Sequence, residues 1–304
     1  MNGWAETALG NVATLQRGYD LPEDRRVPGT VPIVSSSGIS GYHDEARCSG
    51  PGVVTGRYGT LGRVYFIRED FWPHNTTLFV RNFHGNDPRF VYYLLDNIDL
   101  ATHSAVSAVP GLNRNDIHRL PVMLPPLPTQ RRIAEILGRL DDKIEANRRI
   151  NRTLEAMAQA LYRHWFVEFG PFRDGEFVES EVGAIPKRWE VVRLGDVART
   201  NELSIRNGHE PNRITYVDIS SVSACAINSF APMVFVDAPS RARRLVKHGD
   251  TIWSAVRPNR RSFCLIQHPP EGLVVSTGFV VLSPTKVPYS FLYCLLTNTF
   301  AKLS

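Results

Sequence analysis

Glycine, arginine and aromatic residues alternate over a short segment in the first half of the chain. Residues 55–63 read Thr-Gly-Arg-Tyr-Gly-Thr-Leu-Gly-Arg, so Arg57 and Arg63 would project from a turn whose glycines let the backbone approach a ligand closely. Arginine can hydrogen-bond guanine edges, and hydroxyls and backbone amides can hold phosphates. The segment lacks the Gly-Lys-Ser/Thr ending of a nucleotide-binding P-loop, so we do not expect it to bind a nucleotide in that way.

Two other polar segments could reach the same surface: the serine-rich loop 35–38 and the triplet 74–76. In the second half of the chain, the arginine-rich segment 254–261 occupies the matching place. Asn and Gln are the side chains that pair with adenine edges. The candidates for DNA contact are therefore Ser36, Ser37, Thr55, Arg57, Tyr58, Arg63, Asn75 and Thr76, and then Ser254, Arg257, Asn259, Arg260 and Arg261. Arginine clusters also occur on ordinary solvated surfaces, and this alternative stays open.

The candidates come in two groups because the chain contains an internal repeat. Three segments of the first half recur in the same order in the second half: residues 4–13 as 189–198, 76–80 as 276–280, and 87–97 as 287–298. Two copies of one domain suit a ligand that has two separated half-sites. The alternative is that the duplication only builds a larger fold.

A long helical pattern separates the two copies. It follows Pro125, Pro126 and Pro128, with Thr129 as the expected N-cap, and extends to about residue 166. Its steps alternate between four and three residues, which is the spacing of a coiled-coil seam, and roughly 37 residues would make a rod of about 55 Å. The seam positions are Ile133, Leu137, Leu140, Ile144, Asn147, Asn151, Leu154, Ala158, Leu161 and Trp165. Such a seam needs a second helix, which we expect from outside this chain. The alternative, an ordinary helix bent by contact with solvent, stays open.

Each copy mixes short strands with turns and one helix, which predicts an α+β fold. In the first copy we expect strands at 31–35, 52–55, 63–67 and 76–80, and a helix that starts at Asp87-Pro88. In the second copy we expect strands at 214–219, 249–253, 263–266 and 273–282, and a helix from Tyr289.

Composition excludes several classes of protein. The net charge of +5 favours a polyanionic partner only weakly, because the first 125 residues carry about as many acidic as basic side chains. The four cysteines form no Cys-x-x-Cys pair, and His43, His74 and His84 lack metal-ligand spacing, so we expect no metal site. No apolar run is long enough for a membrane span and no export signal is visible. We therefore expect a cytoplasmic protein without a membrane partner.

The helical region and its flanks resemble a known family. Residues 124–151, with Leu-Pro-Pro-Leu-Pro-Thr-Gln and Leu-Asp-Asp-Lys-Ile, are similar to the central conserved region of type I restriction–modification specificity subunits. Residues 154–169, Val-Pro-Gly-Leu-Asn at 109–113 and Pro-Lys-Arg-Trp-Glu at 186–190 also match the pattern of that family. The resemblance is strong through residues 109–200 and looser elsewhere.

The resemblance implies two target-recognition domains joined by a long coiled-coil-type helix. The domains would be residues 1–125, a conserved helix 126–170, a linker 171–185, and a second domain 186–304. The second copy has no counterpart of residues 109–128, so the resemblance implies that this domain is incomplete. Each domain would bind half of a bipartite double-stranded DNA sequence, and the helix would dock methyltransferase subunits. S-adenosylmethionine, ATP and Mg would belong to the methyltransferase and restriction subunits, with no cofactor in this chain.

The alternative function is a catalytic methyltransferase or nuclease subunit. An amine methyltransferase should contain an Asn/Asp-Pro-Pro-aromatic loop, and His268-Pro-Pro-Glu271 lacks both ends of that pattern. Asp141-Asp142-Lys143 superficially resembles a nuclease metal site, but on a helix we expect these residues to form structural ion pairs. The sequence therefore predicts no catalytic residue. A third possibility is an assembly or regulatory fragment that does not read DNA.

Overall fold

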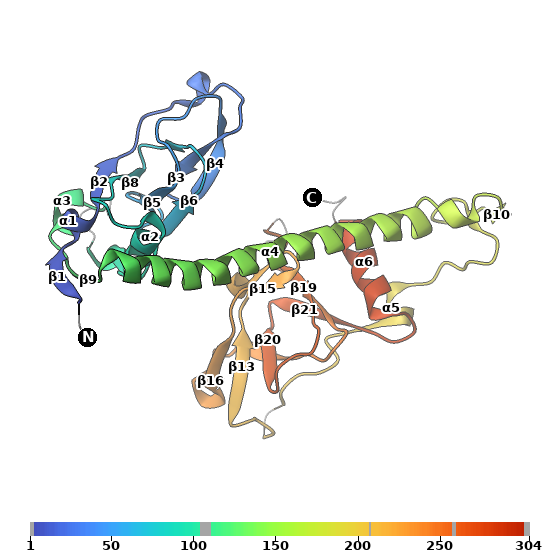
Figure 1. The fold of residues 1–304 in the computed structure, drawn as a ribbon. Coiled ribbons are helices and arrows are strands. Elements are labelled where there is room, and N and C mark those ends of the chain that lie inside the picture. Colours follow the sequence, from blue (N-terminus) through green and yellow to red (C-terminus); the bar gives the residue numbers. More distant parts are fainter. Residues whose placement is uncertain (1–2, 104–110, 207, 257–259, 301–304) are drawn as a thin grey trace. The chain divides into compact units, whose positions relative to one another are not determined.

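The computed structural model describes residues 3–103, 111–206, 208–256 and 260–300 (Figure 1). The chain divides into two compact units, Met1–Arg148 and Arg149–Ser304. Helix α4 (Leu127–Phe166) begins in the first unit and ends in the second. The mixed helix and strand composition confirms the predicted α+β class.

Two sheets form the body of the first unit, with strand orders β2-β8-β5-β6 and β4-β3-β7, while β1 pairs with β9. The strands are β1 (Ala5–Ala8), β2 (Thr14–Arg17), β3 (Val31–Ser35), β4 (Gly38–His43), β5 (Gly52–Gly56), β6 (Val64–Ile67), β7 (Trp72–Pro73), β8 (Thr77–Asn82) and β9 (Pro121–Leu124). The helices are α1 (Leu9–Val12), α2 (Pro88–Asp96) and α3 (Arg114–His118), with 3-10 turns at Glu23–Arg25 and Leu100–His103.

The core of the first unit lies between the four-stranded sheet and the short helices. Leu15 and Leu78 from the sheet, Leu95 from α2 and Ile117 from α3 are almost completely buried there. Helix α2 starts where the sequence predicts, because the Asp87 side chain accepts hydrogen bonds from the backbone N–H groups of the first turn. The end of β5 thus lies beside the start of β8, where Gly56 pairs with Thr77.

The second unit repeats this layout. Its main sheets have the orders β12-β21-β18-β19 and β16-β13-β20-β17, and two smaller ladders are β10-β11 and β14-β15. The strands are β10 (Phe177–Val178), β11 (Ile185–Pro186), β12 (Ala198–Thr200), β13 (Arg213–Val217), β14 (Val222–Ser223), β15 (Ala226–Ile227), β16 (Ala231–Val234), β17 (Ala242–Leu245), β18 (Thr251–Ser254), β19 (Phe263–Leu265), β20 (Leu273–Ser276) and β21 (Phe279–Pro284). The helices are α5 (Leu194–Val197) and α6 (Tyr289–Phe300), with 3-10 turns at Gly170–Phe172, Ile219–Ser221 and Phe235–Asp237.

One strand prediction is wrong. The apolar run 273–282 is not a single strand, because Thr277 and Gly278 break it into β20 and β21, which belong to different sheets. The first unit makes the same change of sheet between β7 and β8. A continuous apolar run therefore hid a turn, since both strands are buried on both faces.

Helix α4 confirms the predicted rod but begins earlier than expected. It contains 40 residues, which corresponds to about 60 Å. Thr129 is not its N-cap, because the helix starts at Leu127 and includes Pro128 in its first turn. A proline is tolerated there since the first N–H groups of a helix have no acceptor within the helix.

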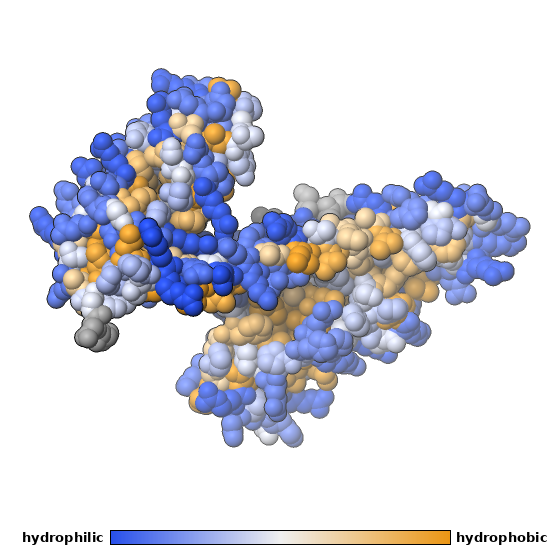
Figure 2. All heavy atoms as spheres, in the orientation of Figure 1, coloured by the Kyte–Doolittle hydropathy of each residue, from blue (hydrophilic) through white to orange (hydrophobic). Residues whose placement is uncertain are grey.

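The predicted seam of α4 is largely exposed in both units. Ile133 packs against the core of the first unit, whereas the other apolar seam residues Leu137, Leu140, Ile144, Leu154, Ala158, Leu161 and Trp165 are exposed. Asn147 and Asn151 are exposed as well. Figure 2 shows hydrophobic side chains along the part of α4 that lies in the second unit. The second helix that would cover the seam stays a prediction.

Candidate nucleic-acid interface

In the first unit, the turn after β5 is tied to the residue that precedes β8. The backbone N–H groups of Arg57 and Tyr58 donate to the carbonyl oxygen of Thr76, at 2.8 and 3.2 Å. Gly56 is required for this turn, because a Cβ atom there would lie 1.8 Å from the carbonyl oxygen of Thr60. The sequence thus folds the glycine-rich segment into a tight loop beside the 74–76 triplet.

The serine loop joins the same cluster. The backbone N–H of Ser36 donates to Oγ1 of Thr76 at 3.3 Å, and the Tyr65 hydroxyl donates to the carbonyl oxygen of Ser36 at 3.2 Å. His74 Nδ1 lies 3.3 Å from the Thr76 hydroxyl, and burial lowers the pKa of His74, with Arg26 acting in the same direction. Three separate loops therefore converge on Thr76, as the sequence predicted they could.

Arginines of this cluster lie over aromatic rings. The guanidinium carbon of Arg57 is 4.5 Å from the ring centroid of Tyr58, and that of Arg63 is 5.7 Å from the ring of Tyr65. Tyr58 and Arg63 are exposed, as is Ser37, whereas Arg57 is half-buried. An exposed guanidinium that is held by a ring keeps its donors available for phosphate or guanine, at a low entropic cost. We call Ser36, Arg57, Tyr58, Arg63 and Thr76 the first reading face.

The sequence did not predict that Asp20 would lie beside this face. Asn75 donates through Nδ2 to Oδ1 of Asp20, and Asp20 also accepts from Arg17 at 3.1 Å. Asp20 comes next to Asn75 because Tyr19 forms a bridge with His74. This pairing joins residues that are distant in the chain, and no local sequence signal marks it.

The equivalent place in the second unit follows β18. Arg260 and Arg261 are exposed, and the guanidinium carbon of Arg261 lies 5.9 Å from the ring of Phe263. Phe263 in turn stacks on Trp253, with 4.4 Å between the ring centroids. Arg257 and Asn259, the other candidates in this segment, lie outside the described residues.

Comparison with known proteins identifies the fold and the family. The family model described as the type I restriction modification DNA specificity domain matches residues 1–156. The chain belongs to this family. The matched residues include the whole first unit of this specificity-domain protein, and with it the first reading face.

Several relatives are known by name. The specificity subunit of the type I restriction enzyme MjaIX of Methanocaldococcus jannaschii is 28% identical over 155 residues, which are 49% of this chain and 35% of the relative. The HindI specificity subunit of Haemophilus influenzae is 37% identical over 92 residues, or 28% of this chain and 20% of the relative. The matches thus span only about a third or less of these relatives' lengths.

A crystal structure of the type I restriction–modification S subunit from M. genitalium has the same fold. The TM-score is 0.56 at 16% sequence identity, and the alignment covers 97% of this chain and 77% of that one. This similarity supports the architecture of two recognition-type domains and a long helix.

Two of the predicted contact residues of this specificity-domain protein are wrong. Thr55 is 1% exposed and Ser254 is 2% exposed, so neither side chain can touch DNA. Both belong to strands that extend further than predicted, β5 to Gly56 and β18 to Ser254. Ser254 instead stabilises the turn after β18, because its hydroxyl donates to the carbonyl oxygen of Val256 at 2.8 Å.

The acidic pair on α4 forms structural contacts, as predicted. Asp142 accepts from Arg89 at 2.7 Å and also pairs with Arg68, while Asp141 accepts from the Tyr93 hydroxyl at 2.5 Å. The hydrogen bond from Arg89 holds the pKa of Asp142 below its usual value. Within the described parts of the chain, no group of three or more His, Cys, Asp or Glu side chains is arranged to hold a metal ion. Across the same ranges, no helix combines the length and apolar character of a membrane span.

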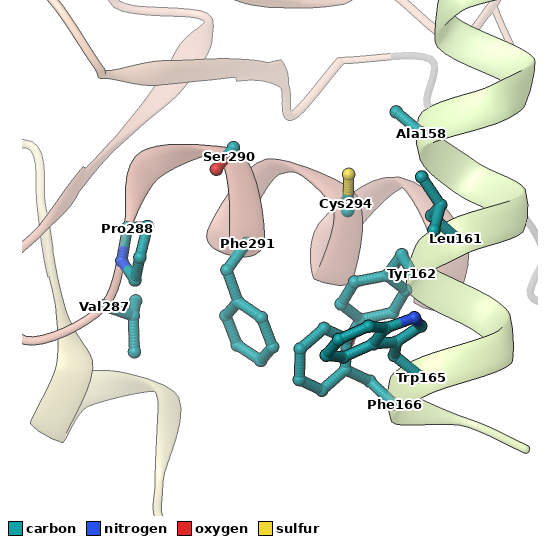
Figure 3. Close-up of a pocket in the computed structure, with 10 residues that line it drawn as sticks. All are labelled: Ala158, Leu161, Tyr162, Trp165, Phe166, Val287, Pro288, Ser290, Phe291 and Cys294. Carbon is teal, nitrogen blue, oxygen red and sulfur yellow. The ribbon is translucent and has the colours of Figure 1, made fainter. Parts of the chain in front are cut away.

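An apolar groove lies within the second unit, between the end of α4 and the start of α6 (Figure 3). Its volume is about 580 Å³. Figure 3 shows the rings of Tyr162, Trp165 and Phe166 gathered beside Phe291, and the Phe166 and Phe291 centroids are 4.9 Å apart. The seam residues Ala158, Leu161 and Trp165 line this groove, so the seam and the groove form one apolar surface in this unit.

Proposed function

We propose that this protein is the sequence-specific DNA-binding subunit of a type I restriction–modification system, and that each unit binds one half of a bipartite target. The observation that carries the proposal is the repeated sheet. In the first unit, β5 pairs with β8 and leads into an arginine-bearing segment. In the second unit, β18 pairs with β21, the counterpart of β8, and also leads into an arginine-bearing segment. Membership of the specificity-domain family supports the same function.

Helix α4 sets the distance between the two half-sites in this proposal. Its continuity over 40 residues gives a spacer of defined length, and its exposed apolar seam offers a surface to the methyltransferase subunits. S-adenosylmethionine, ATP and Mg would be bound by the methyltransferase and restriction subunits. The complex would act in the cytoplasm, where cellular DNA is accessible.

The spacer role is tested by inserting one heptad after Asn147. Seven residues lengthen a helix by about 10 Å, which is about three base pairs, so the preferred gap should grow while both half-sequences stay the same. The readout is selection from a randomised DNA library by the complex with its methyltransferase subunits. An insertion of equal length at the exposed turn between Ser180 and Gly183 serves as the control and should leave the gap unchanged. Altered half-sequences would contradict the proposal.

We further propose that this chain recognises DNA without catalysing a reaction. The family is one of DNA-recognition domains, and the acidic pair on α4 is engaged by Arg89 and Tyr93. The isolated chain incubated with S-adenosylmethionine and target DNA should transfer no methyl group, whereas the complex with methyltransferase subunits should do so. Turnover by the isolated chain would overturn this part and favour the catalytic alternative.

A further inference from the structure

One face of α4 contacts α2 and its flanking residues at several positions along the helix, all within the first unit. The contact nearest the N-terminus of α4 is made by Gln130, whose side chain is 2% exposed. Its Oε1 accepts from the backbone N–H of Asp87 at 3.0 Å, and its Nε2 donates to Oδ1 of Asn86 at 2.8 Å and to the carbonyl oxygen of Pro125 at 2.9 Å. The start of α4 is thus held against the N-terminus of α2.

The second contact is a guanidinium that crosses α4. Nη2 of Arg89 donates to the carbonyl oxygen of Gly138 at 2.9 Å and to Oδ1 of Asp142 at 2.7 Å. A Cβ atom on Gly138 would lie 2.5 Å from the guanidinium carbon, so an alanine here would displace the Arg89 guanidinium from its place across the helix. Arg68 also pairs with Asp142, and Tyr93 reaches Asp141.

These contacts constrain α4 in two ways. Gln130 and Asp142 are separated by about 18 Å along the helix axis, so the two ends of the contact fix its tilt. The guanidinium also bonds a backbone carbonyl and a carboxylate one turn apart, which fixes the rotation of α4 about its axis. The seam residues lie on a neighbouring face of the helix and take no part in these hydrogen bonds.

We propose that Arg89, Gly138 and Asp142 form a clamp that sets the direction of α4 relative to the first unit, and thereby the gap between half-sites that the protein accepts. This inference rests on the proposed function. Arg89 and Asp142 are positioning residues, because they touch neither base nor phosphate in this account. Their side chains are 23% and 45% exposed, so solvent screens the pair, and neither residue belongs to the hydrophobic core of the unit. Breaking it should therefore loosen the orientation of α4 without unfolding the domain.

The first test measures orientation without DNA. Spin labels are introduced at the exposed residues Tyr42 in β4 and Arg148 in α4 through an unnatural amino acid, which leaves the native cysteines unmodified. Double electron–electron resonance should give a narrow distance distribution for the parent chain. Arg89→Ala and Gly138→Ala should each broaden it at least twofold. The matched control is Arg139→Ala, which removes a 2.6 Å pair with Glu135 on the same helix and should leave the width unchanged. Unchanged widths in both clamp variants would overturn the clamp.

The second test measures the gap on DNA, with the chain in its complex. Affinity is compared for targets whose half-sites are separated by the preferred gap and by one base pair more or less. The parent should prefer one gap by tenfold or more, and the clamp variants should reduce this preference to less than threefold. An equal loss of affinity at every gap would show a merely structural role and contradict the proposal. If the parent recognises no bipartite target, the proposed function fails, and the resonance result then decides the mechanical part alone.

Discussion

The two units share the strand order of their main sheet, but they differ in the segments that leave it. Val54 pairs with Phe79 across β5 and β8, and Ser254 pairs with Phe279 across β18 and β21. The two phenylalanines are 3% and 1% exposed. Two residues further on, the first unit has Gly56 and the second has Val256, which rules out the same tight turn in both. Buried positions thus preserve the framework, while the loops at its edge are free to differ.

The helices that follow the sheets show the same division. In the first unit, α2 contacts α4 through polar groups that are paired, such as Arg89 with Asp142 and Tyr93 with Asp141. In the second unit, α6 contacts α4 mainly through aromatic rings and leaves an apolar groove beside Phe291. The comparison teaches that one scaffold attaches to the same helix with two chemistries, one directional and one adaptable.

The largest expected effect tests whether Phe79 and Phe279 have the same structural role in the two units. Phe79→Ala and Phe279→Ala should each lower the free energy of unfolding of their own unit by about 3–5 kcal/mol, because a large buried side chain is replaced by a cavity. Hydrogen exchange resolved by peptide reports each unit separately. If one substitution destabilised its unit by less than about 1 kcal/mol, the two positions would not be equivalent, and the comparison would fail.

The next effect tests whether the first reading face binds DNA. Arg57→Ala should weaken binding to the first half-site by about 1–3 kcal/mol, as expected for a lost arginine–guanine contact, and should leave discrimination at the second half-site intact. Competition binding with each half-site scrambled in turn is the measurement. Arg81→Ala is the matched control, since Arg81 is bonded to Gln16 on β2 and lies outside the reading face. Equal losses with both variants would mean that only net charge matters.

The sequence predicts the framework well because it is written in local patterns. The Asp87-Pro88 start of α2, the strand at 31–35 and the rod of α4 each follow from capping, turn residues or periodicity. The family resemblance was likewise carried by the conserved helical region. Local patterns did not predict how deeply the ends of strands β5 and β18 are buried, and Thr55 and Ser254 were therefore wrongly predicted to be accessible.

The composition of the site was less predictable because it depends on contacts between distant segments. Asp20 meets Asn75 only through a bridge between Tyr19 and His74, and no periodicity encodes that pairing. The interaction of Arg89 with α4 likewise joins two helices. The sequence alone predicted that Asp141 and Asp142 form ion pairs, but it did not identify Arg89 as a partner. Sequence patterns thus locate the loops, whereas the partners within them follow from tertiary packing.

A smaller effect concerns the charge of the second unit. The loop after β13 begins with Asp218, which pairs with Arg241, whereas the loop after β3 in the first unit contains serines at this place. Asp218→Asn should release Arg241 to bind phosphate, so the slope of log K against log salt should steepen by about 0.9 at the second half-site. Titration at three or more salt concentrations measures this. An unchanged slope would show that Arg241 does not face DNA.

The smallest effect is a pH dependence of the first unit. His118 Nε2 accepts from the backbone N–H of Leu15 at 2.8 Å, which joins α3 to β2 and requires a neutral ring. Burial lowers the pKa of His118, and Arg114 lowers it further, so the unfolded chain binds a proton more readily than the folded unit. The stabilisation should be complete above about pH 6.5, the usual value for unfolded histidine, and should be lost as the pH falls below it. Denaturant unfolding of the first unit between pH 5 and 8 measures the loss. His118→Gln can accept the same hydrogen bond without titrating, so it should reduce the pH dependence and leave the part that comes from His74, whose pKa is also lowered. An unchanged profile would assign the whole pH dependence to other groups.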